Sequence, residues 1–291
     1  MSSIAYSGGT VVSTTFTCTT GTRAEIVSGL GAILVSAGWT SLGSGLYKSA
    51  TTAAPKGNSI RMRLIDPGSG NCAQIKLEND AGTKISGAAW LLPGVGKIYR
   101  VIACQYNFFC FTPGNSAARE FVCGGTLYIP DFLEGVVVGS FGWLQGNADT
   151  DSSSSIRKSF RTKLGTQNEG LAARQAFLKN DILLDFIQIS SVAGQNLLVQ
   201  SSGFTDLFGS SWRWSDDSIG VMEAILCSGI SSTSDESKRQ GIIHNGMIVS
   251  DSFAADTIPT SAYDGHNWWA ITDGNVGSGS DAKGTLFVAT N

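Results

Sequence analysis

The sequence predicts a β-rich α+β fold: an N-terminal helix packed on an antiparallel sheet, followed by an irregular β-rich unit with long loops. One observation is a capped stretch with helical spacing near the N-terminus. Another is the densest apolar and aromatic run of the chain, KIYRVIACQYNFFCFTPGNSAAREFVCGGTLYIP, from Lys97 to Pro130. The third is composition, because Gly supplies 36 of 291 residues and charged residues only 15%, whereas average domains carry about 25% charged residues. Many turns, and a surface that partner subunits can cover, follow from this composition.

Residues 1–21 contain Ser, Thr and Gly in abundance and no charged residue. They are expected to form an extended arm with one short strand at Thr10 to Thr17. Since the arm has too little apolar content to fold alone, we expect neighbouring subunits to order it, by strand addition to an adjacent sheet.

The helix is predicted directly after the arm. Thr22 and Glu25 form a capping box, and Gly38 lies where a C′ glycine belongs. Gly29 and Gly31 each cost about 1 kcal/mol relative to Ala inside a helix, so the helix needs tertiary packing. These glycines allow close approach to a sheet. The apolar stripe at helical spacing comprises Ile26, Leu30, Ile33, Leu34 and Ala37.

Two hairpins are predicted after the helix. Trp39 to Ser49 turns around Gly43-Ser44-Gly45. Ser59 to Ile65 alternates in polarity and ends in Asp66-Pro67-Gly68, a strong turn signal, and Cys72 to Leu77 returns. Alternating segments joined by such turns are typical of hairpins.

The apolar run from Lys97 to Pro130 predicts strands that complete a sheet against the helix. Pro113-Gly114-Asn115 has the chemistry of a turn, and Glu120 to Ile129 is expected to form the next strand. Phe109 and Phe111 share a strand face if this run is extended, and at least one of them is expected to be fully buried.

A boundary is predicted at residues 130–135. The chain then divides into an arm (1–21), a helix-on-sheet domain (22–135) and an irregular β-rich domain (136–291). A short helix is expected at Asn168 to Leu178. Strands are expected at Leu183–Ile189, Leu197–Gln200, Ser218–Cys227, Gly241–Ser250, Trp268–Thr272 and Thr285–Ala289.

Several classes of function are disfavoured by composition. A net charge of −3 argues against nucleic acid held by a broad basic surface. Ile26 to Tyr47 has no charge but is interrupted by Ser, Thr and Gly, so no membrane span is expected, and no signal peptide either. The six Cys show no CxxC spacing, so we expect no metal site. We also expect reduced thiols, in a protein that is made in the reducing cytoplasm of the host.

No catalytic residue and no cofactor is predicted. Pro93-Gly94-Val95-Gly96-Lys97 is similar to a phosphate loop, but Leu91 stands where the first Gly should be, and Ile98 replaces the Ser/Thr that holds magnesium. His244 and His266 are far apart in the sequence, and each is expected to be a hydrogen-bonding loop or strand residue.

Two tryptophan clusters are the candidate contact sites. Trp212 and Trp214 precede Asp216 and Asp217, and His266 precedes Trp268 and Trp269. Aromatic rings beside carboxylates and amides are typical of sugar-binding platforms, whereas buried rings are core or subunit-interface anchors. The second interpretation is favoured, and the first stays open.

Three groups of residues then point to a family. The first is the helix ending at Ala37-Gly38-Trp39 with the hairpin after it. The second comprises Tyr99–Ala103, Tyr106–Phe109, Pro113-Gly114, Arg119–Gly125 and Ile129-Pro130. The third comprises Arg239–Ile242, Asn245, Ile248–Ser250, Tyr263–Trp268 and Gly284–Phe287. In these segments the chain resembles virion structural proteins of tailed bacteriophages, encoded among tail and baseplate genes.

The resemblance implies a structural subunit in many copies, with no active site carried over. The expected partners are copies of the chain and other virion proteins, with no nucleic acid and no membrane, and the expected location is the virion, in the tail or baseplate. The alternative is a glycan-binding module that contacts the host surface. The position of the tryptophans discriminates between the two: burial between subunits supports assembly, and an open groove lined by them supports glycan binding.

Overall fold

The structure is a computed structural model that describes residues 9–51, 59–82, 89–113, 120–128, 140–145, 175–177, 183–185, 221–227, 239–249, 265–270 and 285–291. Within these ranges the chain is β-rich, with one helix and three antiparallel sheets. The predicted fold class is confirmed at this level. None of the described helical residues forms a segment both long and apolar enough to cross a membrane.

The largest sheet curls and has the order β1-β7-β8-β9-β14-β16-β15, with β10 paired to β9 and β13 paired to β14. Its strands are β1 (Val12–Thr17), β7 (Ile98–Ala103), β8 (Asn107–Phe111), β9 (Phe121–Tyr128), β10 (Ser140–Gln145), β13 (Val221–Cys227), β14 (Arg239–Val249), β15 (Trp268–Ala270) and β16 (Thr285–Ala289). The second sheet has the order β2-β3-β4-β5-β6. Its strands are β2 (Thr40–Gly43), β3 (Leu46–Lys48), β4 (Ile60–Ile65), β5 (Ala73–Asn79) and β6 (Ala89–Leu91). A small third sheet pairs β11 (Gln175–Phe177) with β12 (Leu183–Asp185).

The helix α1 (Arg23–Ser36) begins and ends where its caps predict. Thr22 is the N-cap and its side chain accepts from the Glu25 N–H, while Gly38 adopts a φ of 95°. The second half of the capping box differs, because the Glu25 carboxylate accepts from the backbone of Thr19, Thr20 and Gly21. The Thr19 hydroxyl also donates to this carboxylate. Its bond is the largest cause, followed by the Thr19 backbone bond, that lowers the pKa of Glu25 to about 2.

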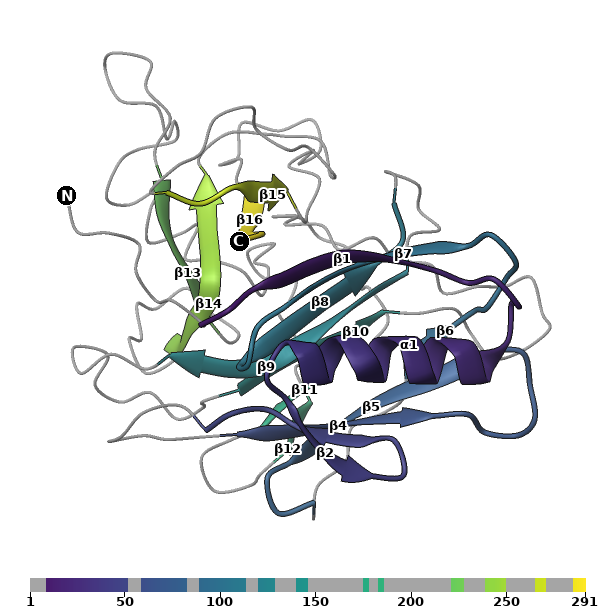
Figure 1. Cartoon of the computed structure of the whole chain (residues 1–291). Helices are drawn as coiled ribbons and strands as arrows, with labels where there is room; N and C mark the ends of the chain where they lie inside the picture. The colour runs from purple at the N-terminus through teal and green to yellow at the C-terminus, as the bar shows by residue number, and fades with distance from the viewer. Residues whose placement is uncertain are drawn as a thin grey trace, which may run out of the picture.

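The helix lies between the two larger sheets, with β1 on one side and β2 to β5 on the other (Figure 1). Gly29 and Gly31 are two residues apart and therefore about 200° apart around the axis. A Cβ on Gly29 would lie 2.3 Å from the ring of Phe16 in β1, and one on Gly31 would lie 2.0 Å from the hydroxyl of Tyr47 in β3. Each glycine thus allows close approach of one sheet. The sequence predicted close approach of a single sheet, and the structure has two.

The strands of the apolar run Lys97–Pro130 do not join the predicted hairpins in one sheet. Both hairpins are confirmed as β2–β3 and β4–β5. β7 instead pairs with β1, so that Val12 lies opposite Ala103 and Thr17 opposite Ile98. The strand expected in the arm is confirmed, but its partner is the chain's own β7 rather than a neighbouring subunit. β-branched and aromatic residues, which favour strands, occur on both β1 and β7 and make this pairing available within one chain.

Both faces of β8 are buried, as expected for the organising run. Phe109 and Phe111 are each 0% exposed, which confirms the prediction for this pair. Phe108 and Cys110 point to the opposite side, into the core shared with α1 and the second sheet. β8 therefore separates two apolar layers.

The second half of the chain agrees with the sequence in part. Strands are confirmed at β12, β13, β14, β15 and β16, while Leu197–Gln200 lies outside the described residues. The helix expected at 168–178 is wrong at 175–177, where β11 pairs with β12, because a short backbone ladder replaces a weak helical pattern. The boundary at 130–135 is also outside the described residues; β9 and β10, on either side of it, pair with each other. The three-part division stays a prediction.

The side chains of five of the six cysteines are described, and all five are buried free thiols. They are Cys18, Cys72, Cys104, Cys110 and Cys123. The prediction of reduced thiols is confirmed for them, and the Cys227 side chain lies outside what the structure describes.

Candidate functional site

The predicted contact residues divide into two groups. Trp212, Trp214, Asp216 and Asp217 lie outside the described residues. His266, Trp268 and Trp269 lie at the start of β15, at the end of the curled sheet. The structure therefore describes one of the two tryptophan clusters.

Both tryptophans of β15 are buried within the chain. Trp268 is 2% exposed and packs with Met247 and Phe287. Trp269 is 6% exposed and lies edge-on to Phe111 of β8, 5.6 Å between ring centroids, with the Arg100 guanidinium 4.3 Å above its ring. A sugar-stacking platform needs an open ring face, and these two rings are covered. The glycan-binding alternative stays a prediction for Trp212 and Trp214.

His266 anchors the last residues of the chain. Its Nδ1 lies 2.8 Å from the carbonyl oxygen of Asn291. The neighbouring Asn267 donates its N–H to the Asn291 side chain at 2.6 Å and accepts from the Thr290 N–H at 2.8 Å. The expectation that His266 is a hydrogen-bonding residue is confirmed, and its described role is structural.

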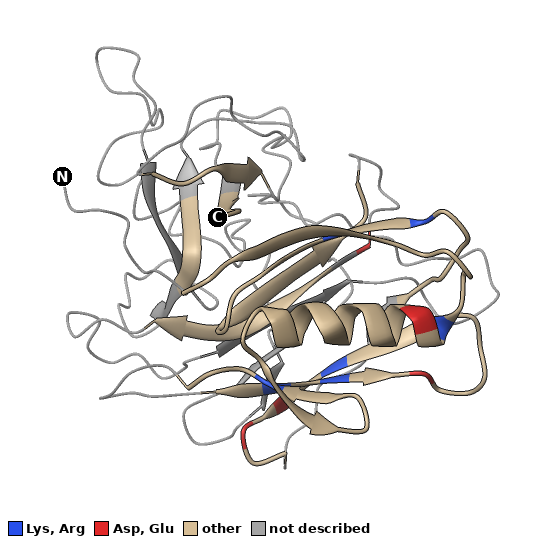
Figure 2. Cartoon of the chain, in the orientation of Figure 1, with Lys and Arg blue, Asp and Glu red and all other residues tan. Residues whose placement is uncertain are grey.

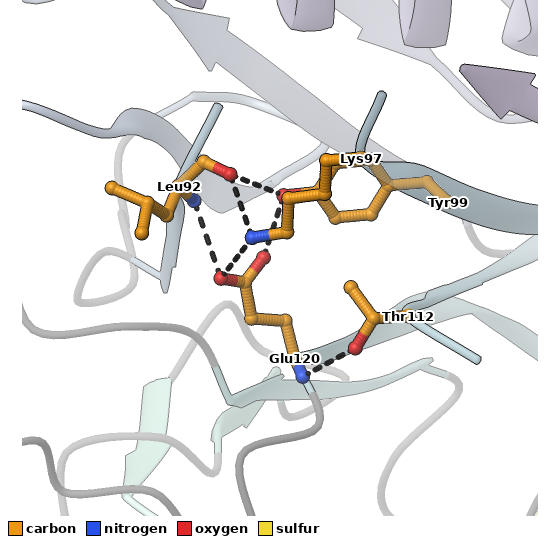
Figure 3. Close-up of polar contacts among 5 residues, drawn as sticks. All are labelled: Leu92, Lys97, Tyr99, Thr112 and Glu120. Atoms are coloured by element: carbon orange, nitrogen blue, oxygen red, sulfur yellow. Dashed lines mark hydrogen bonds and ion pairs between the residues drawn. The ribbon is translucent and has the colours of Figure 1, made fainter. Parts of the chain in front are cut away.

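A buried polar cluster lies elsewhere, where the chain passes from β6 of the second sheet to β7 of the first (Figure 3). We call it the Glu120 network; it comprises Leu92, Lys97, Tyr99, Thr112 and Glu120. Lys97 Nζ donates to Glu120 Oε1 and to the Leu92 carbonyl, each at 2.7 Å. The Tyr99 hydroxyl lies 2.6 Å from Glu120 Oε2 and 2.9 Å from the Leu92 carbonyl. Thr112 Oγ1 accepts from the Glu120 N–H at 3.0 Å.

Burial governs the chemistry of this network. Burial, and after it the charge of Glu120, raises the pKa of Tyr99 far above its ordinary value, so the phenol stays a proton donor. Burial also raises the pKa of the Cys110 thiol, and a thiol that is not ionised is a poor nucleophile. The network therefore holds an ion pair and a phenol in place and offers no activated nucleophile from these side chains.

The contacts of Lys97 also argue against phosphate binding by the loop from Pro93 to Lys97. Its ammonium group is engaged by Glu120 and the Leu92 carbonyl, whereas a phosphate-loop lysine must reach the phosphates. Among the described residues, no cluster of three or more His, Cys, Asp or Glu side chains is arranged to hold a metal ion.

Sequence reasoning missed the pairing of Lys97 with Glu120. Each residue comes directly before a strand of the apolar run, at Ile98 and Phe121. Two opposite charges at the heads of two buried strands are the available signal, because a charge next to a core needs a partner.

Comparison with protein-family models finds no match to this chain, and comparison with curated protein sequences finds no match either.

Proposed function

We propose that this protein is a structural subunit of a tailed-bacteriophage virion, in the tail or baseplate, and not an enzyme. It acts by binding copies of itself and other virion proteins. In this proposal residues 22–135 supply the helix-on-sheet unit that contacts a neighbour, and residues 136–291 supply an irregular β-rich unit with long loops. The phage assignment rests on the resemblance of the sequence segments, and the assembly role rests on the outer face of α1.

The outer face of α1 is exposed and carries no charge. It comprises Ala24, Ser28, Ala32, Val35 and Ser36. Val35 is 49% exposed, and the two serine hydroxyls donate to the carbonyls of Glu25 and Ala32 in the helix itself. The opposite faces contact the two sheets, so beyond its first turn, which holds Arg23 and Glu25, α1 has apolar or small residues all round. Such a helix is typical of a buried position, which favours a neighbouring subunit over this face.

The strands that flank α1 support the same proposal. β1 and β2 each end a sheet and contain no charged residue. Figure 2 shows that charge gathers at the N-terminal end of α1 and on the second sheet, while β1 and most of α1 have none. Sheet edges of free monomers are usually guarded by charges or Pro. Two edges without charge beside a helix whose outer face is uncharged favour a surface that is covered on assembly.

The test compares two matched substitutions in the full-length chain. Ala32→Lys places a charge in the outer face of α1, and Ala81→Lys places the same charge in the exposed turn after β5. Sedimentation velocity is expected to show oligomers for the wild type and for Ala81→Lys, with a concentration for half-assembly raised at least tenfold by Ala32→Lys. A wild-type chain that stays monomeric alone and with purified virion proteins contradicts the assembly role.

The phage assignment needs a separate measurement. Imaging of native particles that contain the labelled subunit is expected to place the label on a tail or baseplate in regular copies. A label on any other structure, or a protein that never enters particles, contradicts the assignment.

A further inference from the structure

β14 changes its neighbour in the middle of its length. Ile242 and Ile243 pair with Tyr128 and Leu127 of β9, whereas residues 246–249 pair with β16. Between them Asn245 adopts a φ of 56°, which is uncommon for a residue other than glycine. β9 and β14 therefore share two residue pairs, while β8 and β9 share five. The part of the sheet formed by β13 to β16 is joined to β7–β9 by a short ladder.

His244 lies at this change of neighbour, with its side chain inside the protein. The residue is 4% exposed. Its ring stacks on Tyr106 at 4.3 Å between centroids and lies edge-on to Tyr128 at 6.2 Å. Neither ring nitrogen has a hydrogen-bond partner among the described residues, which corrects the expectation of a hydrogen-bonding histidine. Its carbonyl does have one, because Asn107 donates to it at 2.9 Å.

Among the side chains that the structure describes, no carboxylate offsets a charge on this ring. The described side chains that stack against it are Tyr106 from the β7–β8 turn and Tyr128 from β9. Glu223 of β13 and Arg239 of β14 are charged residues of the neighbouring strands, and neither is in register with His244. Burial alone lowers the pKa of His244 to about 4. A protonated ring gains cation–π attraction from tyrosine, but this is weaker than the hydration that a buried ion loses.

We propose that the junction between β9 and β14 is an acid-sensitive hinge, in which protonation of His244 expels its ring from between Tyr106 and Tyr128 and parts the two strands. The sign follows from linkage. The open state, with a solvated ring, binds a proton below its ordinary pKa of about 6.5, whereas the closed state does not until about pH 4. Opening therefore becomes more favourable as the pH falls through this window. The same relation gives an opening constant about 20-fold larger at pH 5 than at pH 7.

Hydrogen exchange of the full-length chain, followed by mass spectrometry at pH 7 and pH 5, tests the hinge. After correction for intrinsic rates, peptides of β14 and β16 are expected to open about 20-fold more at pH 5, with no such change in β7 and β8. The chain has two histidines, so His266→Phe is the matched control and keeps the effect. His244→Phe retains an aromatic ring and removes the effect.

Two results overturn the hinge. One is a pH response in His244→Phe equal to that of the wild type, and the other is an equal response in β7 and β8. If His244→Phe does not fold, ring-proton NMR of the wild type decides. A histidine that titrates below pH 5 supports the hinge, whereas two histidines that both titrate near pH 6.5 overturn it.

Discussion

Two buried polar sites of the same sheet differ in how their ionisable groups are matched. In the Glu120 network, Lys97 and Tyr99 converge on one carboxylate and share the Leu92 carbonyl. Around His244, two tyrosine rings contact an imidazole whose nitrogens have no hydrogen-bond partner among the described residues. A buried polar group costs free energy unless it is paired. The first site therefore supports the native fold, and the second lowers its stability as the solution becomes acidic.

The largest loss of stability is expected in β8, the apolar strand between the two sites. Phe109 of β8 is completely buried, so Phe109→Ala is expected to lower the free energy of unfolding by about 3–5 kcal/mol. Urea unfolding at pH 7 measures it. A loss below about 1 kcal/mol, for this variant and for Phe111→Ala, would show that β8 does not organise the core.

The next largest effect is expected in the Glu120 network. Glu120→Ala leaves the Lys97 ammonium without its carboxylate, and breaking a buried pair costs about 3–5 kcal/mol. Because the Lys97 side chain is 24% exposed, water recovers part of this loss, and we expect about 3 kcal/mol. Urea unfolding of Glu120→Ala beside the double variant Lys97→Met/Glu120→Leu tests it. The double variant removes both charges and should recover more than half of the loss; no recovery would mean that the pair is not the cause.

A smaller effect is expected where His244 meets Asn107 of β8. Asn107→Leu keeps the approximate size of the side chain but removes the donor to the His244 carbonyl, at a cost of about 1–3 kcal/mol. Unfolding curves give the cost, and hydrogen exchange locates it. Faster exchange in β14 at pH 7, with the pH response of His244 retained, is the expected pattern. Exchange that rises equally throughout the sheet would mean that Asn107 does not hold this junction in particular.

The sequence predicted those features that are encoded within a few residues. The Thr22 cap and the hairpin turns at Gly43-Ser44-Gly45 and Asp66-Pro67-Gly68 are set by backbone preferences that one sequence displays. The spacing of Gly29 and Gly31, on opposite sides of α1, was the available sign of two sheets rather than one.

The pairing of distant strands was not predictable in the same way. Alternating polarity indicates a strand but does not name its partner, and nothing local connects Tyr128 with Ile242. For the same reason Trp268 and Trp269 resembled contact residues. Trp269 is covered by Arg100 and Phe111, from strands more than 150 residues earlier in the sequence, and Trp268 is covered by Met247 and Phe287 of two other strands.

The burial of Cys104 has a practical consequence for labelling chemistry. Its thiol lies 3.2 Å from the Asn107 side chain, and burial raises its pKa to about 11, so at neutral pH about one molecule in ten thousand carries the reactive thiolate. A maleimide reagent therefore reacts with Cys104 only when the protein opens locally. Because Asn107 also donates to the His244 carbonyl, the proposed hinge predicts that separation of β9 from β14 raises the alkylation rate of Cys104. Mass spectrometry measures this alkylation rate at a natural residue, without any introduced probe.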